Sequence, residues 1–554
     1  MISHEGKARL WFQRNLPVLL CAVLLLVVVP MRDLWAPDEP DFAQCVKEMR
    51  LRGEWLVPYL NGTPYSEKPI LYYWVLKLFA IGFDRLTGGF GFSHGVAAWA
   101  LRLPSALASI LFLRGLQGWT ERFLSRQVAR NVVLILGTTP IWFWQSQFIQ
   151  IDLLFSALLA WSWLCGLGGF LLITGEAAGQ PEEGRHMLIQ AYIWLALAFL
   201  AKGPLALLLS GLIFLAFLAW QGDWTVLRRL ELTRGLLILL LLAAPWYVAS
   251  AISEGGRYAY ELIVHQNFER ATRAWDHIQP WWRYGQYLLG DFFPWVLLLP
   301  GLTLQLVRSG SFRRPVHRFL ILAFLVPLLT LSAVQSKQGK YLLMGYPFLA
   351  VLLADQLSVS HSAQRLAGWL LPAGFATLGL TLMAVQFGVG GPELQVTVGP
   401  YLAILGALSA VCFGGAAAMV LKVRQKPHPQ IVPAASMVLA LLFGVAGTWG
   451  FHQVDPRKNY RAWTESVQPL SAGRKVFFWQ TIRSGVMIYT DHLMPEIRDA
   501  ASLERLDPES RVVCQRNVWE QNAWGMTPAL RSRFEVLLAV PIGGSEFLLL
   551  RRKG

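Results

Sequence analysis

Long apolar runs, separated by short polar connections, occupy most of the chain. A membrane-spanning helix needs roughly 17 to 25 mainly apolar residues. About thirteen runs approach or reach that length. Between two of them stands Lys202-Gly203-Pro204, a charged residue followed by two helix breakers, which predicts a tight turn. The runs lie near residues 15–31, 95–113, 131–148, 153–174, 187–202, 204–221, 235–252, 286–307, 319–335, 341–358, 366–389, 400–421 and 431–449. The pattern therefore predicts an all-α polytopic membrane domain of about thirteen helices.

The pattern changes near residue 450, after which the apolar runs are only long enough for strands. Five short runs have a strand-like composition, and the segment 501–506 between them is helix-like. The strand-like runs are 475–480, 485–490, 511–515, 534–540 and 546–552. We therefore predict two domains: a transmembrane domain over residues 1–449 and a small α/β domain over residues 450–554.

Composition and the placement of charge agree with a membrane protein. Charged residues make up 15% of the chain and the mean hydropathy is +0.43, whereas soluble domains carry about 25% charged residues. Basic residues gather in the N-terminus and in alternate connections, at 114–130, 228–234, 308–318 and 422–426. By the positive-inside rule these segments face the cytoplasm. The N-terminus is then cytoplasmic and residues 450–554 are extracytoplasmic, and the net charge of +15 needs no nucleic-acid partner to explain it.

The connections on the opposite, outer face carry most of the unusual polar residues. In the long first loop, 32–94, Asp38-Glu39 opens a helix-like stretch, and Glu67-Lys68 precedes an aromatic, apolar segment. Further along, Asp152 interrupts an apolar run. The remaining candidates on this face are Lys202, His265, Arg270, Arg273, His277, Lys337, Lys340 and Tyr341. Ionisable residues near membrane spans are functional candidates by default, and their gathering on one side strengthens the case.

This mixture of side chains suits a phosphate-bearing lipid substrate. Lysine and arginine bind phosphate, carboxylates with a histidine supply a base or bind a divalent metal, and aromatic rings pack against a lipid chain or a sugar. Structural roles remain alternatives for single residues. Asp38 fits a helix N-cap, Lys68 and Lys202 fit side chains that extend toward lipid headgroups, and a lone His265 is more often structural than a ligand. Trp281-Trp282 fits an interfacial aromatic belt.

Several motifs resemble those of the lipid-linked-sugar glycosyltransferases of the GT-C superfamily. The motifs are DEP at 38–40, GEWLVPYLNGTPYSEKPILYYW at 53–74, ALRLPSALAS at 100–109, LAKGPLALLL at 200–209, PWYVA at 245–249, HQNFERATR at 265–273, HIQPWWRY at 277–284 and SKQGKYLLMGYPFLA at 336–350. The chain resembles in particular the 4-amino-4-deoxy-L-arabinose lipid A transferases and related protein O-mannosyltransferase-like enzymes. The order of the motifs over roughly residues 15–355 makes the resemblance specific for the family.

The resemblance implies a bacterial inner-membrane enzyme with about thirteen helices and a periplasmic α/β domain. It also implies inverting transfer of a sugar from undecaprenyl phosphate to a periplasmic-face acceptor, such as lipid A, another glycan or a protein, without a nucleotide cofactor. The implied roles are catalysis for Asp38, Glu39 and Asp152, donor-phosphate binding for Lys68, Arg270, Lys202, Tyr341 and Lys337, and divalent-metal binding for Glu67 and His265.

Two departures from the family pattern bear on the identity of the sugar or the acceptor. Asp41-Phe42 stands where aminoarabinose transferases typically have Arg-Tyr, and Ile70 stands where the usual motif has a second proline. Two other functions stay open at this stage. One is transfer to a protein acceptor, although the Trp-Trp-Asp signature of oligosaccharyltransferases is not present. The other is transport of a lipid-linked sugar, although the sequence shows no internal repeat of the kind common in transporters.

Overall fold

The computed structural model describes residues 4–87, 97–269, 277–391, 394, 397–425, 430–480, 482, 484–490, 493–542 and 544–553. The chain forms two compact units. The first comprises Met1–Val29, Ser66–Tyr72 and Pro104–Gly450, and the second comprises Pro30–Tyr65, Tyr73–Leu103 and Phe451–Gly554. Most of the predicted first loop therefore belongs to the same unit as the C-terminal residues, whereas residues 66–72 belong to the first unit.

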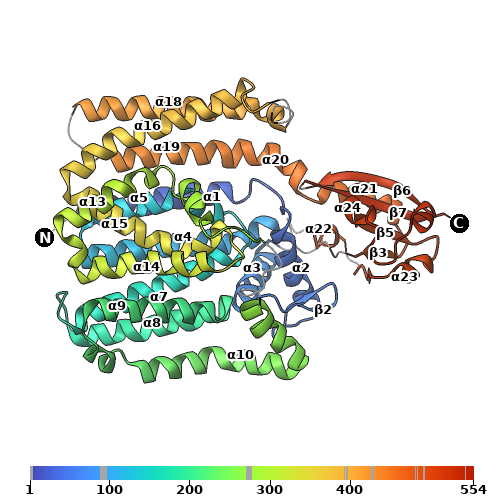
Figure 1. Cartoon of the computed structure of the whole chain (residues 1–554), viewed down its shortest axis with the longest axis horizontal. Coiled ribbons are helices and arrows are strands. Elements are labelled where there is room, and N and C mark those ends of the chain that lie inside the picture. The colour runs from blue at the N-terminus through green and yellow to red at the C-terminus, as the bar shows by residue number, and fades with distance from the viewer. Residues whose placement is uncertain are drawn as a thin grey trace. The chain divides into compact units, whose positions relative to one another are not determined.

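Apolar helices make up the first unit (Figure 1). They are α1 (His4–Val28), most of α4 (Ala98–Phe123), α5 (Arg126–Gly137), α6 (Pro140–Ser146), α7 (Ile151–Ile173), α8 (Pro181–Lys202), α9 (Leu205–Gln221), α10 (Leu232–Tyr260), α12 (Arg283–Asp291), α13 (Leu299–Ser309), α14 (Pro315–Ala333), α15 (Tyr346–Val359), α16 (His361–Gln386), α18 (Leu402–Gln425) and α19 (Ile431–Val445). Short 3₁₀ segments include η3 (Trp295–Leu298) and η5 (Gly339–Gly345), and η2 (Glu261–Glu269) is a π-helix.

By length and composition, ten helices in the described residues are able to cross a membrane, or eleven if the bent pair formed by α12 and η3–α13 is one span. Two more of the predicted runs coincide with helices that are each too short to count as a membrane span. One is α9, an apolar helix of 17 residues. The other is the pair α5 and α6, which is interrupted at Thr138-Thr139 directly before Pro140. The chain is thus a multi-pass membrane protein, while a count of thirteen spans stays a prediction.

The predicted turn between α8 and α9 is confirmed. Helix α8 ends at Lys202, and Gly203 then adopts a φ of 82°, a conformation that favours glycine. The amide of Gly203 donates to the carbonyl of Phe199 at 2.7 Å, and Pro204 follows as the N-cap of α9. This stop places the ammonium-bearing Lys202 at the very end of an apolar helix.

Small residues bring α7 and α8 close together. A Cβ at Gly169 of α7 would lie 2.8 Å from the carbonyl oxygen of Gly184 of α8, too close for a real side chain. Close backbone approach at small residues is the usual way in which membrane helices pack. As a result α7 is buried over most of its length, including Asp152 in its first turn.

The second unit joins first-loop elements to a small C-terminal sheet domain. The first-loop elements are α2 (Asp38–Leu51), the hairpin of β1 (Tyr59–Leu60) and β2 (Thr63–Pro64), and most of α3 (Leu71–Thr87). The C-terminal elements are α20 (Phe451–Lys458), α21 (Arg461–Ser471), β3 (Val476–Trp479), α22 (Ser484–Met487), β4 (Glu496–Ile497), α23 (Ala500–Glu504), β5 (Arg511–Gln515), α24 (Arg516–Trp519), α25 (Pro528–Ser532), β6 (Phe534–Ile542) and β7 (Ser545–Arg552).

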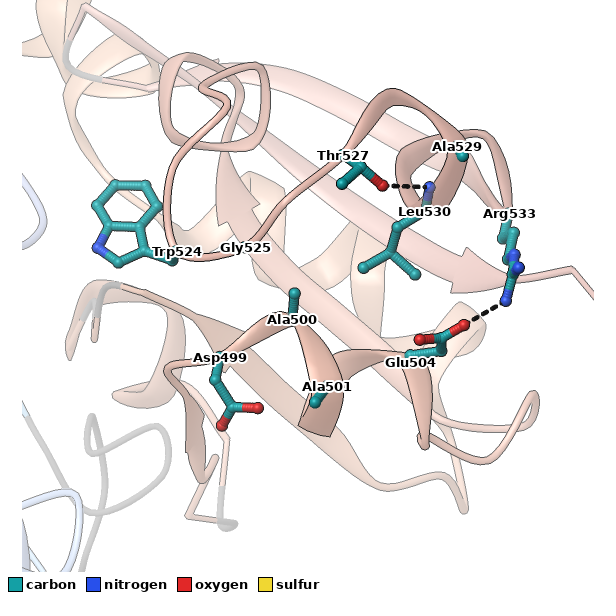
Figure 2. Close-up of a pocket in the computed structure, with 10 residues that line it drawn as sticks. All are labelled: Asp499, Ala500, Ala501, Glu504, Trp524, Gly525, Thr527, Ala529, Leu530 and Arg533. Atoms are coloured by element: carbon teal, nitrogen blue, oxygen red, sulfur yellow. Dashed lines mark hydrogen bonds and ion pairs between the residues drawn. The ribbon is translucent and has the colours of Figure 1, made fainter.

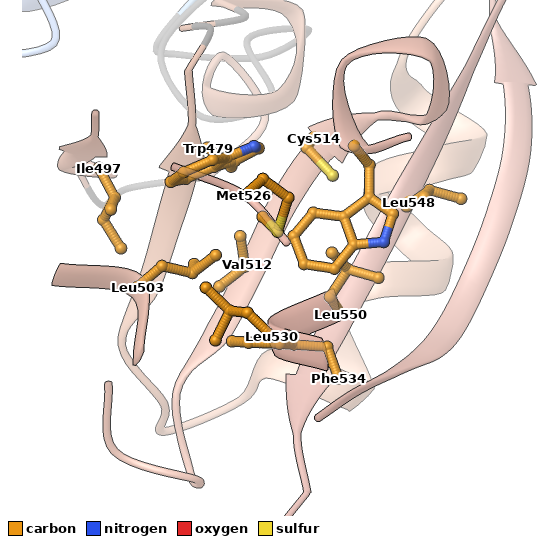
Figure 3. Close-up of a cluster of buried hydrophobic side chains, with 11 residues drawn as sticks. Trp479, Ile497, Leu503, Val512, Cys514, Met526, Leu530, Phe534, Leu548 and Leu550 are labelled. Atoms are coloured by element: carbon orange, nitrogen blue, oxygen red, sulfur yellow. The ribbon is translucent and has the colours of Figure 1, made fainter. Parts of the chain in front are cut away.

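The sheet has the strand order β4-β3-β5-β7-β6. Strand β3 pairs in parallel with β4 and β5, and β7 pairs antiparallel with β5 and β6. Alternate residues of β5, Val512 and Cys514, contribute to one apolar core and lie opposite Leu550 and Leu548 of β7. Two tryptophans and short helices complete that core (Figure 3). The predicted α/β character of this region is therefore confirmed, with β3, β5, β6, β7 and α23 at their expected places.

The prediction of a strand over 485–490 is wrong. The segment forms α22 and a turn instead. The buried ammonium of Lys47, on α2, donates to the carbonyl oxygens of Ile488 at 3.1 Å and Thr490 at 2.6 Å. These bonds satisfy backbone groups that a strand would direct to a neighbour. The two-residue strand β4 was not predicted, because so short a segment has no recognisable pattern.

Candidate functional site

A group of ionised side chains surrounds the N-terminal end of α7. The carboxylate of Asp152 is 4% exposed, and it accepts a hydrogen bond at Oδ1 from the ammonium of Lys202. The Nζ atom of Lys340 lies 3.8 Å from Oδ2 of the same carboxylate. An anion at a helix N-terminus and a cation at a helix C-terminus are each stabilised by the helix dipole. The ends of α7 and α8 thus favour this ion pair before any ligand is considered.

Lys68 and Tyr341 complete this group. The positive charge of Lys68 acts on Asp152, and its ammonium donates to the carbonyl of Glu67 at 3.1 Å. The Nζ atom of Lys202 lies 4.8 Å from the centre of the Tyr341 ring, within the range of a cation–π contact. We call Lys68, Asp152, Lys202, Lys340 and Tyr341 the Asp152 cluster. Its three lysines and one carboxylate leave a formal charge of +2, which suits a phosphate group.

Lys337 has a different environment, although it was predicted to bind the donor phosphate. Its side chain is 3% exposed, and its ammonium donates to the carbonyls of Val334 and, at 3.2 Å, Gln279. Its backbone amide donates to the carbonyl of His277 at 3.0 Å. In this arrangement Lys337 ties the segment 277–279 to the segment 334–337, and its phosphate role stays a prediction.

The residues predicted to bind a metal do not form a complete site by themselves. The Nδ1 atom of His265 lies 2.7 Å from Oε2 of Glu269, whose other oxygen accepts a hydrogen bond from Tyr260. Glu67 is exposed. Over the described parts of the chain, no three His, Cys, Asp or Glu side chains lie close enough together to hold a metal ion. The predicted Arg270 lies outside the described residues.

Asp38 and Glu39 belong to the second unit, in the first turn of α2. The N-cap position of α2 is Pro37, so the alternative in which Asp38 caps the helix does not hold. Asp38 is the first helical residue and is half-buried. Carboxylates in a first turn are favoured by the helix dipole. A proton-accepting role for Asp38 is consistent with this position and stays a prediction.

Glu39 is committed to its protein neighbours. It is 1% exposed, and both of its oxygens accept hydrogen bonds from Arg32 and from Arg102, the latter at 2.9 Å. The amide of Trp35 donates to Oε2 at 2.9 Å. Burial alone would raise the pKa of Glu39, but the charges and hydrogen bonds of Arg102 and Arg32 outweigh burial and lower this pKa to about 2. These contacts indicate that Glu39 anchors the start of α2.

The residues directly before Asp38 are held by side chains that the sequence did not reveal. Oδ1 of Asp455, on α20, accepts hydrogen bonds from the amide of Asp33 at 2.9 Å and from the indole of Trp35 at 2.7 Å. The carboxylate of Asp33 accepts from Tyr489 and from Arg461, each at 2.6 Å. Partners separated by more than 400 residues leave no spacing signal in the sequence. The carboxylate in MRDLWAP was the one local cue.

A pocket in the sheet domain contains none of the predicted site residues (Figure 2). Its charged and polar groups already have protein partners. Glu504 pairs with Arg533, Asp499 accepts from the amide of Ser502 at 2.7 Å, and Thr527 caps α25. These pairings give the pocket a structural explanation, and the Asp152 cluster remains the better candidate for ligand chemistry.

Curated proteins similar to this chain are sugar transferases. Over 490 residues the chain is 28% identical to the undecaprenyl phosphate-alpha-4-amino-4-deoxy-L-arabinose arabinosyl transferase of Pectobacterium atrosepticum, covering 84% of this chain and 80% of that protein. Over 348 residues it is 31% identical to arabinosyl transferase 2, a protein of otherwise the same name, from Pseudomonas fluorescens. That match covers 62% of this chain and 56% of that protein. No protein-family model matches the chain.

The fold agrees with these relatives. The crystal structure of ArnT from Cupriavidus metallidurans bound to undecaprenyl phosphate superimposes with a TM-score of 0.78 at 20% identity, covering 96% of this chain and 97% of that one. The chain therefore has the GT-C fold of ArnT, and the resemblance predicted from its motifs is confirmed.

Proposed function

We propose that this chain is a membrane glycosyltransferase that moves a sugar from undecaprenyl phosphate to lipid A. The observation that carries the proposal is the Asp152 cluster, an excess of partly buried lysine charge in a chain with the fold of ArnT. The names of the relatives support the donor class, and the motif resemblance to lipid A transferases supports the acceptor. The charge pattern of the sequence supports a periplasmic reaction face and a cytoplasmic N-terminus.

In this proposal the lysines act on the donor phosphate. Lys68, Lys202 and Lys340 bind its oxygens and stabilise the negative charge that grows on the phosphate as the sugar leaves. Asp152 holds the ammonium of Lys202 in place and offsets part of the repulsion among the three lysines. Tyr341 contributes the ring against which Lys202 lies.

The transfer itself is a single displacement in this proposal. The acceptor oxygen forms a bond to the anomeric carbon while the bond from that carbon to the phosphate oxygen breaks, which inverts the configuration. By the resemblance, Asp38 takes the proton of the acceptor hydroxyl or orients that hydroxyl for attack. The fit of Glu67 and His265 to a metal ion is incomplete in the described residues, so no step depends on a metal.

The decisive experiment is in vitro transfer with purified protein in detergent, combined with mass spectrometry of lipid A from cells. Lys68→Met and Lys340→Met remove donor-binding charge without breaking the direct contact between Asp152 and Lys202. We expect each to lower kcat/KM at least tenfold, since a hydrogen bond to a charged group is worth about 1.5–3 kcal/mol. Asp38→Asn should abolish transfer. The matched control is Lys422→Met, at an exposed position of α18, which should leave transfer unchanged.

The outcomes separate the competing functions. If a mass increment on lipid A disappears both on deletion and with Asp38→Asn, the increment identifies the sugar and its carrier identifies the acceptor. An increment lost from a protein instead would replace lipid A with a protein acceptor. Full transfer by Asp38→Asn and by both lysine variants would contradict the roles proposed for these residues. No transfer by the purified wild type would contradict the enzyme and favour transport of a lipid-linked sugar.

A further inference from the structure

One carboxylate contacts both ends of the segment that carries two members of the Asp152 cluster. The carboxylate belongs to Asp291, the last residue of α12, where the broken span turns by 109° into η3 and α13. Its Oδ2 atom accepts a hydrogen bond from the hydroxyl of Tyr346 at 3.0 Å. The neighbouring Phe292 stacks on the Tyr346 ring with a centroid distance of 5.6 Å, and both rings are fully buried. The bend therefore holds the residue that directly follows η5.

The same oxygen also lies against the first residue of η5. A Cβ at Gly339 would lie 2.9 Å from Oδ2 of Asp291 and 3.5 Å from Oδ1. Real Cβ atoms essentially never lie within 3.0 Å of a non-bonded heavy atom, so residue 339 has room for a glycine only while the carboxylate keeps this place. Gly339 has no positive φ, so contact, and not backbone conformation, accounts for the glycine.

The approach to η5 is paired with the approach to α12. The amide of Gln279 donates to the carbonyl of Gln335 at 3.1 Å, and Ile278 forms a β-bridge with Ser336. The two bonds of Lys337 to residues 277 and 279 extend the same pairing. The stretch 277–292 thus contacts the stretch 334–346 near both of its ends, and Asp291 makes the second of these contacts next to Lys340 and Tyr341 in the sequence of η5.

We propose that Asp291 is a positioning residue for donor binding. By fixing Gly339 and Tyr346, its carboxylate holds η5 in the conformation that places Lys340 near Asp152 and the Tyr341 ring near Lys202. The ligand whose binding depends on this arrangement is the phosphate of a polyprenyl phosphate. The inference rests on the proposed function for the identity of that ligand, and on the contacts of Asp291 alone for the positioning.

The first test compares donor binding and turnover in variants of Asp291. Asp291→Ala removes the hydrogen bond and the contact with Gly339, and we expect the donor KM and the dissociation constant for undecaprenyl phosphate to rise about tenfold, with kcat within threefold. Asp291→Asn keeps an oxygen that accepts from Tyr346 and should stay within threefold of the wild type in both constants. A residue that only stabilises the bend would lower the yield of folded protein and leave KM unchanged. The matched control is Asp223→Ala, which changes an exposed aspartate that accepts hydrogen bonds from the nearby Thr225.

The second test uses the close contact at residue 339. Gly339→Ala alone should raise the donor KM at least tenfold, because the new methyl group displaces the carboxylate. In the Asp291→Ala background the same methyl group meets no carboxylate, so Gly339→Ala should add less than a twofold further change. Equal effects of Gly339→Ala in the two backgrounds would overturn the proposal, and so would a wild-type KM in Asp291→Ala.

A third measurement separates this inference from the proposed function. Reductive methylation followed by mass spectrometry reports the accessibility of Lys340, without any substrate. We expect Asp291→Ala to raise the methylation rate of Lys340 at least threefold relative to the exposed Lys422. If the wild type binds no undecaprenyl phosphate, the proposed function fails while the labelling still decides the positioning role. An unchanged labelling rate would overturn that role even in an active enzyme.

Discussion

Neighbouring carboxylates can have opposite roles at the start of one helix. Glu39 is buried and accepts hydrogen bonds from two arginines and one backbone amide. Asp38, one residue earlier, is half-buried at the first helical position. The contacts of Glu39 hold the start of the helix, and they thereby fix the backbone position of Asp38. Because Glu39 is buried and engaged by these neighbours, Asp38 is the better candidate of the two for contact with a substrate.

We expect Glu39→Gln to destabilise the protein strongly. The substitution leaves the two buried guanidinium groups of Arg32 and Arg102 without their anion, and breaking a buried pair in this way typically costs about 3–5 kcal/mol. Thermal unfolding of the purified protein in detergent, followed by tryptophan fluorescence, should show a lower Tm. Glu67→Gln removes an exposed carboxylate and is the matched control, with a Tm close to the wild type. Equal Tm values for the two variants would contradict the anchoring role.

The ion pairs of Glu39 with Arg32 and Arg102 also predict how the stability of the protein depends on pH. The folded-state pKa of Glu39, about 2, lies below its ordinary value of 4.5. The ionised carboxylate therefore stabilises the fold fully above pH 4.5, and this contribution is lost as the pH falls from 4.5 toward 2. Between these values the Tm of the wild type should fall more steeply than the Tm of Glu39→Gln, whose side chain does not titrate. Parallel curves would mean that other groups govern the acid transition.

At the scale of elements, α2 is held at several positions by other parts of the second unit. Its start is held through Glu39, and its middle is held by Lys47 through the carbonyls of residues 488 and 490. Glu48 accepts hydrogen bonds from the amides of Asn61 and Gly62 in the β1–β2 turn. The side chain of Asn61 then exchanges two hydrogen bonds with the backbone of Met494. Asn61 and Gly62 thus join α2 to the segment near Met494.

Lys47→Met should loosen the turn after α22 without unfolding α2. Methionine keeps the length of the side chain, but it leaves the carbonyls of Ile488 and Thr490 without their donor, at a penalty of about 1–3 kcal/mol for each unsatisfied buried group. Hydrogen–deuterium exchange should accelerate for the amides of 484–490, while α2 stays protected. As a control, Lys475→Met replaces an exposed lysine of the sheet domain and should leave that exchange unchanged. Unchanged protection in Lys47→Met would show that the turn forms without the lysine.

The sequence predicted elements better than contacts. Apolar runs located the helices, and the Lys202-Gly203-Pro204 stop was predicted because glycine and proline act locally. Asp152 was identified because a charge in an apolar run is expensive. By contrast, the sequence contains no sign of the hydrogen bonds made by Arg102, Asp455 and Tyr489. Their partners lie far away in the chain, and no local pattern around these residues indicates them. The failure at 485–490 has the same origin, since a distant lysine replaced the strand partner.

At the scale of the whole chain, the second unit is built from segments at opposite ends of the sequence. Residues 30–65 and 73–103 fold together with residues 451–554. The consequence is that the C-terminal part contributes directly to the position of the segment that leads into Asp38, through Asp455, Arg461 and Tyr489. Residues 451–554 therefore do more than form the sheet, because they also supply contacts that hold the segment leading into α2.

Asp455→Ala tests this consequence while leaving the sheet domain intact. The substitution removes three hydrogen bonds, to Asp33, Trp35 and the side chain of Asn459, each worth about 1 kcal/mol. We expect transfer to fall at least tenfold, and exchange of the amides of residues 33–35 to accelerate. Asp499→Ala is the matched control: it removes the N-cap of α23 and about 1 kcal/mol of local stability in the sheet domain, but no contact of the segment before Asp38. If Asp499→Ala lowered transfer as much as Asp455→Ala, sheet-domain stability alone would explain the loss. If Asp455→Ala transferred sugar at the wild-type rate with unchanged exchange, the C-terminal part would not position α2 for catalysis.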